Sequence, residues 1–181
     1  MIIFIAVLFA IGFWFVITFN NFIREKNLIN EAWSGIDVQL KRRFDLIPNI
    51  VETVKCYAQH EKKIFEEVAA LRTSSYGFAG ARERGEAENG ITRGLKSLFA
   101  VAEAYPELKA NQNFLALQKT LSEIEDEIQL ARRYYNGTVR NYNIRVESFP
   151  SMVIGKLCNF QPKEYFEIEL ATQRETPAVA M

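Results

Sequence analysis

The chain has 181 residues and a mass of 20.8 kDa, which suits one modest domain rather than two. Lys and Arg number 22, and Asp and Glu also number 22, which argues against a nucleic-acid-binding protein that relies on net positive charge. The charges are unevenly placed, because residues 1–23 carry none and hold six of the 14 Phe. The sequence therefore predicts a membrane segment joined to a soluble domain.

The first segment has the length of a membrane span. Residues 1–19 are uncharged, and as a helix they extend about 28 Å, close to the roughly 30 Å of a bilayer core. A cleaved secretory signal begins with a basic residue and ends in small residues, and residues 1–22 have neither feature. We predict an uncleaved anchor over residues 1–23. Because the nearest basic residues, Arg24 and Lys26, follow it, the N-terminus is expected outside and the soluble domain in the cytoplasm.

A long amphipathic helix is predicted to continue from the anchor. Apolar residues recur at spacings of three and four, namely Trp33, Ile36, Leu40, Ile47, Val51, Val54, Ala58, Phe65, Val68 and Leu71. No Gly-Pro punctuation separates this stripe from the anchor, so one rod is expected to end near Thr73. Pro48 removes one backbone hydrogen bond and is expected to kink the rod.

The middle of the chain is rich in glycine. Residues 74–94 contain five of the nine Gly together with alternating charges, which predicts a loop. A shorter helix follows and ends at Tyr105-Pro106. This helix is too short to return along the whole first helix. Either the Gly-rich loop covers the remaining stripe, or the stripe is left for a second copy to pack against.

A second long helix is predicted from about Asn113 to the residue before Pro150. Two seven-residue series support it: Phe114, Leu121, Ile128, Tyr135, Tyr142 and Phe149 form one, and Leu117, Ile124 and Ala131 form the other. Short helical pieces are expected at residues 152–157 and 165–170, and residues 171–181 are expected to form a flexible tail.

The predicted fold class is all-α, because no strand pattern occurs anywhere in the sequence. The predicted organisation is a transmembrane anchor over residues 1–23, continuous with an elongated antiparallel helical bundle over residues 24–170 in the cytoplasm. The tail follows the bundle.

Catalytic and metal-binding signatures are missing from the sequence. The single histidine, His60, lacks the second histidine of a zinc-protease helix, and Cys56 and Cys158 have no metal-binding or redox spacing. Carboxylates cluster at residues 123–127, where we expect a solvated helix face rather than a di-iron site. We therefore expect no cofactor, no metal and no enzymatic activity.

Three charged residues fall in the apolar seams. Arg43 and Glu61 lie in the seam of the first helix, and Arg145 continues the series of Leu117 in the last helix. A buried charge is costly unless it is paired, so each is expected to find an opposite charge or a carbonyl on another helix. Alternatively, the long side chains extend along the bundle into water.

A regular polar row is expected on the outside of the last helix. Gln129, Asn136 and Asn143 lie seven residues apart, and Arg133 and Arg140 occupy the neighbouring row. Such a row is either a solvated face or a protein-contact surface, because amides and guanidinium groups pair in a directed way. We name Gln129, Asn136, Arg140 and Asn143 as the candidate oligomer surface.

Four segments carry distinctive motifs: residues 41–49 (KRRFDLIPN), 57–61 (YAQHE), 103–111 (EAYPELKAN) and 131–136 (ARRYYN). Through these motifs the chain resembles the LemA family of membrane-anchored bacterial proteins, and the resemblance extends over residues 1–168. Cys56 stands where the family usually has a small residue. The resemblance implies a transmembrane helix, an outside N-terminus and a cytoplasmic helical bundle, but no reaction. Its motifs single out Arg42, Arg43, Asp45, Pro48, Asn49, Glu61, Arg132, Arg133, Asn136 and Asn143 as structural or interaction residues.

Three functions compete at this point. The first is a non-enzymatic scaffold of the bacterial cytoplasmic membrane whose partners are the bilayer and further copies of the chain. The second is an accessory subunit or adaptor of another membrane protein, such as a protease. The third is an enzyme that uses helix carboxylates or Arg42 and Arg43. No feature favours nucleic acid as a partner. Particle size after detergent extraction distinguishes the first two, and bound metal would revive the third.

Overall fold

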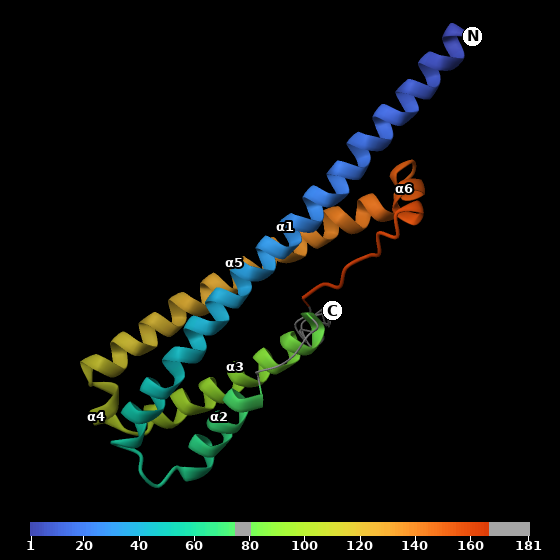
Figure 1. Ribbon diagram of the computed structural model, residues 1–181. Helices are drawn as coiled ribbons and strands as arrows, with labels where there is room; N and C mark the ends of the chain where they lie inside the picture. The colour runs from blue at the N-terminus through green and yellow to red at the C-terminus, as the bar shows by residue number, and fades with distance from the viewer. Residues whose placement is uncertain (75–80, 167–181) are drawn as a thin grey trace, which may run out of the picture. The chain divides into compact units, whose positions relative to one another are not determined.

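The computed structural model describes residues 1–74 and 81–166, and this part of the chain is helical without strands (Figure 1). The all-α prediction is therefore confirmed. The helices are α1 (Ile2–Lys55), α2 (Lys62–Ser74), α3 (Ala81–Glu103), α4 (Pro106–Lys109), α5 (Gln112–Glu147) and α6 (Ser151–Leu157).

Helix α1 runs without interruption from the apolar segment into the charged part of the chain, as predicted. Within the described residues it is the one helix long and apolar enough to cross a membrane. Its first turns are exposed, with Phe9 at 78% and Phe13 at 64%, so packing among the described residues does not account for their apolar character. Pro48 lies inside α1, as expected.

The rod ends earlier than the sequence predicts, at Lys55 rather than near Thr73. The N–H groups of Tyr57 and Ala58 both donate to the carbonyl of Val54, at 3.1 and 2.9 Å, which closes the helix in a turn. Ala58 is buried in the same apolar cluster as residues from α2. The segment between α1 and α2 contains neither Gly nor Pro, so tertiary packing decides this break.

The predicted loop over residues 74–94 is wrong from Ala81 onward, where α3 begins; residues 75–80 lie outside the described part of the chain. Gly90 and Gly94 lie one turn apart on α3 and face Leu71 of α2. A methyl group on them would come within 3.1 and 2.9 Å of the Leu71 side chain. The glycines therefore allow close packing of α3 on α2, although they disfavour an isolated helix.

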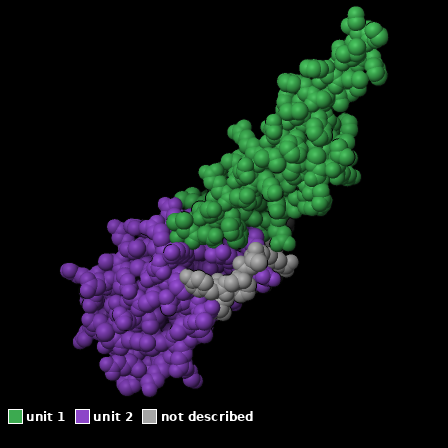
Figure 2. Space-filling model, in the orientation of Figure 1, with its two compact units in different colours: residues 1–38, 128–165 green, residues 39–127, 166–181 purple. Residues whose placement is uncertain are grey.

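The chain divides into two compact units (Figure 2). Unit 1 contains residues 1–38 and 128–165, and unit 2 contains residues 39–127 and 166–181. The predicted helix over residues 165–170 is not seen at Tyr165 or Phe166, and its remainder lies outside the described residues, as does the predicted tail.

Unit 2 has an apolar core that covers the stripe of α1. Ile47, Ile50 and Val54 of α1 are buried together with Leu95 and Leu98 of α3. The helix that covers the stripe of α1 is longer than the sequence predicts, because α3 begins within the Gly-rich segment.

Unit 1 has an aromatic core. The ring of Phe22 on α1 stacks on Phe160 with a centroid distance of 4.7 Å and meets Tyr142 of α5 edge-on at 6.1 Å. The chain reverses after α6 because Asn159 adopts a left-handed conformation with φ of 56°. The N–H of Phe160 then donates to the Gly155 carbonyl at 2.8 Å, a C-terminal helix cap that returns the chain toward α1.

Helix α5 begins where the sequence predicts. The side-chain oxygen of Asn111 accepts hydrogen bonds from the N–H groups of Asn113 and Phe114, at 2.9 and 3.1 Å. These donors have no partner within the helix, so Asn111 acts as the N-cap.

Candidate functional site

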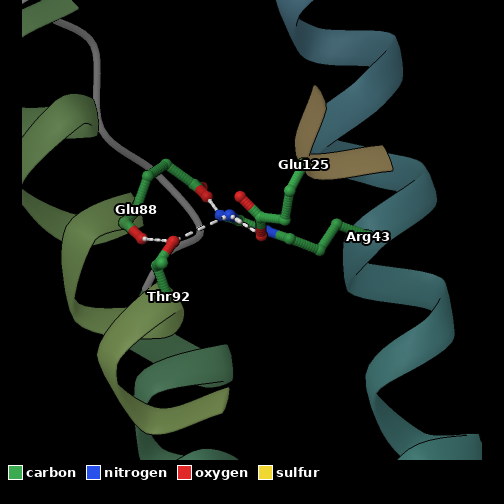
Figure 3. Close-up of polar contacts among 4 residues, drawn as sticks. All are labelled: Arg43, Glu88, Thr92 and Glu125. Atoms are coloured by element: carbon green, nitrogen blue, oxygen red, sulfur yellow. Dashed lines mark hydrogen bonds and ion pairs between the residues drawn. The ribbon is translucent and has the colours of Figure 1, made fainter. Parts of the chain in front are cut away.

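A buried charge cluster connects three helices of unit 2 (Figure 3). Arg43 of α1 is 1% exposed and forms ion pairs with Glu88 of α3 and, at 2.7 Å, with Glu125 of α5. Its guanidinium group also donates to the Thr92 hydroxyl at 3.1 Å. The Thr92 hydroxyl in turn donates to the backbone carbonyl of Glu88 at 3.1 Å. The cluster thus joins α1, α3 and α5 through directed, charge-assisted contacts.

The cluster confirms that Arg43 is a paired seam charge and supplies partners that sequence analysis missed. Glu88 was missed because residues 74–94 resembled a loop, and Glu125 was assigned to a solvated face. The Glu88 side chain is 6% exposed and the Glu125 side chain 26%. The signal that identifies Glu88 is the seam position of Arg43, which requires a buried carboxylate from another helix.

The second seam charge, Arg145, is also paired. Its guanidinium nitrogens Nε and Nη2 lie 2.8 and 2.7 Å from the same oxygen of Glu25, Oε1. The prediction that Glu61 lies in the seam of the first helix is wrong. It lies in the connection between α1 and α2, because the heptad of α1 stops at Lys55.

The predicted polar row on α5 is only partly on the surface. Gln129, Arg133 and Arg140 are exposed, as expected, and Asn136 is half-buried with contacts of its own. Asn143 is buried, so its assignment to the candidate oligomer surface is wrong.

The Asn143 amide binds the returning chain after α6. Its nitrogen donates to the Lys163 carbonyl at 2.9 Å, and its oxygen accepts from the Lys163 N–H at 2.8 Å. Tyr135 supports the same segment, because its hydroxyl donates to the Glu164 carbonyl at 3.1 Å. Burial raises the pKa of Tyr135, and the Glu164 carboxylate raises it further.

The remaining motif residues divide between surface and interior. Arg42, Asp45 and Asn49 are exposed on α1, Pro48 is half-buried, and Arg132 is buried at 4% exposure. Arg42 donates to the side chain of Gln39 at 3.1 Å. The motif around Pro48 therefore has one face in the core and one polar face toward solvent.

An exposed apolar row on α5 was not predicted. Leu130, Tyr134 and Ile144 are 51%, 53% and 55% exposed. Gly137 lies on the same side of α5, and a methyl group added to it would meet no atom of the described residues within 4 Å. We call Leu130, Tyr134, Gly137 and Ile144 the α5 face. The heptad pattern does not identify these residues, because they lie between the positions of the buried seam.

The described residues contain no group of three or more His, Cys, Asp or Glu side chains arranged to hold a metal ion. His60 is exposed, and Cys56 and Cys158 are free thiols. The buried carboxylate of Glu88 and the partly buried carboxylate of Glu125 are both paired with Arg43.

Within the motif of residues 41–49, Arg43 and Ile47 are buried in unit 2, while Arg42, Asp45 and Asn49 are exposed. The LemA family model matches residues 32–181. The chain belongs to the LemA family. The match begins after the apolar first turns of α1 and covers both units.

LemA-family relatives with curated names are distant in sequence. Magnetosome protein MamQ 2 of Paramagnetospirillum magneticum is 24% identical over 90% of this chain and 70% of its own length. Magnetosome protein MamQ of Magnetospirillum gryphiswaldense is 24% identical over 74% and 58% of the two chains. Protein LemA of Metamycoplasma hominis is 27% identical over the same shares. Membership of the LemA family and the apolar part of α1 together indicate a membrane-associated protein.

Proposed function

We propose that this LemA-family chain is a non-enzymatic scaffold, anchored by residues 1–23 with its N-terminus outside and its helical units in the cytoplasm. Copies associate side by side in the membrane through unit 1. The observation that carries this proposal is the α5 face, where Leu130, Tyr134 and Ile144 are exposed and Gly137 lies beside them with open space over its Cα.

The composition of the α5 face fits close helix packing. Gly137 costs an isolated helix about 1 kcal/mol relative to Ala, and among the described residues no atom lies close enough to require the glycine. A second helix gains close approach there, and Leu130 and Tyr134 supply apolar area beside the contact. Arg133 and Arg140 border the face and favour an acidic partner.

A complementary surface exists on α1 within the same unit. Glu31, Gly35 and Val38 follow one another at spacings of four and three, and all are exposed. This row is acidic and apolar, and its glycine also has open space around it. Contact between the α5 face of one copy and this α1 row of the next is head-to-tail, so it forms a ring or an open array according to the rotation between copies.

The second copy is favoured as the occupant because every copy of an anchored chain shares one membrane plane, which raises its local concentration. The MamQ relatives are named as magnetosome proteins, and a name that refers to a cellular structure is in keeping with a scaffold.

The mass of the full chain in mild detergent tests self-association. We expect particles of more than one copy, and a monomer at high concentration would contradict the proposal. Arg133→Glu combined with Arg140→Glu should weaken the particles without unfolding the chain, since both side chains are exposed. Arg93→Glu combined with Lys96→Glu is the control, because it makes the same charge change on an exposed part of α3.

An adaptor for another membrane protein is the second candidate. It is favoured by the exposed polar face of Arg42, Asp45 and Asn49, which the core does not require. In the adaptor function, crosslinking in native membranes yields a defined complex with a second protein, and that complex is lost in Asp45→Ala. In the scaffold function, the crosslinks join copies of this chain.

Topology is tested separately. A reporter that is active only in the cytoplasm, fused after Met181, should be active. Activity of a secretion-dependent reporter at the same position would overturn the proposed orientation.

A further inference from the structure

Helix α6 and the turn before it expose large apolar side chains. Val153 and Leu157 lie four residues apart and therefore share one side of α6, where they are 52% and 74% exposed. Phe149, in the turn before α6, is 80% exposed. The side of α6 that carries Ile154 and Gly155 is buried. We call Phe149, Val153 and Leu157 the α6 patch. Apolar side chains gathered on a surface in this way mark contact with a partner or a membrane.

The last turns of the anchor hold α6 in place (Figure 1). A methyl group added to Gly155 would lie 3.7 Å from Cζ of Phe22. After α6, the ring of Phe160 stacks on Phe22 at 4.7 Å and lies 5.8 Å from the ring of Phe19. Phe19 and Phe22 belong to the anchor over residues 1–23, so α6 and the turn that follows it are packed against the anchor itself.

These contacts set the depth of α6 in a bilayer. An anchor over residues 1–23 is centred on residue 12, so Phe19 lies about 10 Å and Phe22 about 15 Å from the midplane along the helix axis. The hydrocarbon core ends about 15 Å from the midplane, and the polar layer ends about 20–22 Å from it. Phe22, and Gly155 with it, therefore lies at the boundary between acyl chains and head groups. Amphipathic helices that lie on a membrane bury their apolar side at this boundary.

We propose that α6 is a second membrane contact of this chain, in which the α6 patch inserts into the leaflet on the side of the helical units. The acyl chains that surround the exposed apolar turns of α1 then continue over Val153 and Leu157. Lys156, exposed next to Leu157, extends its ammonium group to the head groups. Moving α6 out into water would separate Gly155 from Phe22, whose side chain is fully buried.

The inference rests on the anchoring by residues 1–23 in the proposed function and is independent of self-association. Contacts at the membrane boundary set the tilt of a spanning helix. The α6 patch lies to one side of the axis of α1, so its insertion favours one direction of tilt for unit 1.

Fluorescence quenching in vesicles tests the position of the α6 patch. The full chain, with Cys56 and Cys158 replaced by Ser, receives one new thiol that carries a bimane label, and it is reconstituted in phosphatidylcholine vesicles. Val153→Cys and Leu157→Cys place the label in the α6 patch, and both side chains are exposed enough to be replaced without disturbing the core. Lipids with a nitroxide at carbon 5 or carbon 12 of the acyl chain quench a label in the bilayer, and iodide quenches a label in water.

Two further positions calibrate the measurement. Phe13→Cys places the label inside the anchor, next to the midplane, where Phe13 is 64% exposed. Asn30→Cys places it on an exposed part of α1 about 27 Å from the midplane, which is beyond the polar layer. The Phe13 position therefore reports a label among acyl chains, and the Asn30 position reports a label in water.

We expect the lipid nitroxides to quench the labels at positions 153 and 157 at least half as strongly as the label at position 13. Carbon 5 should be more effective than carbon 12 at positions 153 and 157, because the α6 patch is shallow. Iodide should quench these two labels at least threefold less than the label at position 30. Weaker lipid quenching would overturn the proposal: strong iodide quenching would place the patch in water, and protection from both quenchers would assign it to a protein partner.

The same measurement separates this inference from the proposed anchoring. Absence of lipid quenching at position 13 would overturn the anchor, whereas its absence at positions 153 and 157 alone would overturn only the second contact. Dilution distinguishes lipid from a second copy of the chain. A tenfold lower protein-to-lipid ratio should change the protection from iodide less than twofold, and loss of protection on dilution would assign the α6 patch to contact between copies and overturn the proposal.

Discussion

Replacing Arg43 by Met should destabilise the helical bundle strongly. Arg43 is the sole cation that the structure shows between Glu88 and Glu125 within the described residues, and its side chain is 1% exposed. Met keeps a similar volume but removes the charge and the hydrogen bond to Thr92. The Glu88 carboxylate, at 6% exposure, then stays in the core without a partner charge.

The expected loss is about 3–5 kcal/mol, the usual cost of removing one partner from a buried ion pair. Glu88 accounts for most of it, because Glu125 is a quarter exposed and regains water when Arg43 is removed. A domain has a total unfolding free energy of about 5–15 kcal/mol, so the variant should lose a large part of its stability. Arg42→Met is the matched control, since Arg42 is exposed on the next position, and it should change stability by less than about 0.5 kcal/mol.

Urea unfolding of the full chain in mild detergent, followed by helical circular dichroism, measures these differences. Arg43→Met combined with Glu88→Leu should recover at least half of the loss, because it removes the unpaired charge together with its partner. A loss of unfolding free energy below about 1 kcal/mol in Arg43→Met would refute this reasoning. So would a double variant that recovers none of the loss, because Arg43 and Glu88 would then not act as a buried ion pair.

Three further outcomes follow from single contacts. Gly137→Ala should stabilise the monomer by about 0.5–1 kcal/mol in thermal unfolding and weaken self-association. Stabilisation with an unchanged particle mass would contradict the role of the α5 face in self-association. Asn143→Ala should cost about 2 kcal/mol and speed amide hydrogen exchange near Lys163, because two hydrogen bonds are lost. The raised pKa of Tyr135 means that the folded state holds its proton more tightly, so stability should fall above about pH 10; Tyr135→Phe, which lacks the hydroxyl bonded to Glu164, should reduce that fall.

Residue patterns along the chain were sufficient to predict several elements. The all-α class, the continuity of the apolar N-terminal segment with the amphipathic part of α1, and the span of α5 all depend on hydrophobic periodicity and local capping. The structure shows each of them. It was also predictable that Arg43 and Arg145 would each pair with an opposite charge, because a charge in a buried apolar seam requires a partner.

Tertiary packing decided the features that local sequence describes poorly or contradicts. Helix α3 forms over Gly90 and Gly94 because close contact with Leu71 outweighs the low helix propensity of glycine. Helix α1 ends at Lys55 because Ala58 enters the core, although no residue there breaks a helix. Asn143 turns inward because a segment twenty residues later offers its backbone as donor and acceptor. Each outcome depends on a partner distant along the chain, and a local pattern carries no information about where such a partner lies.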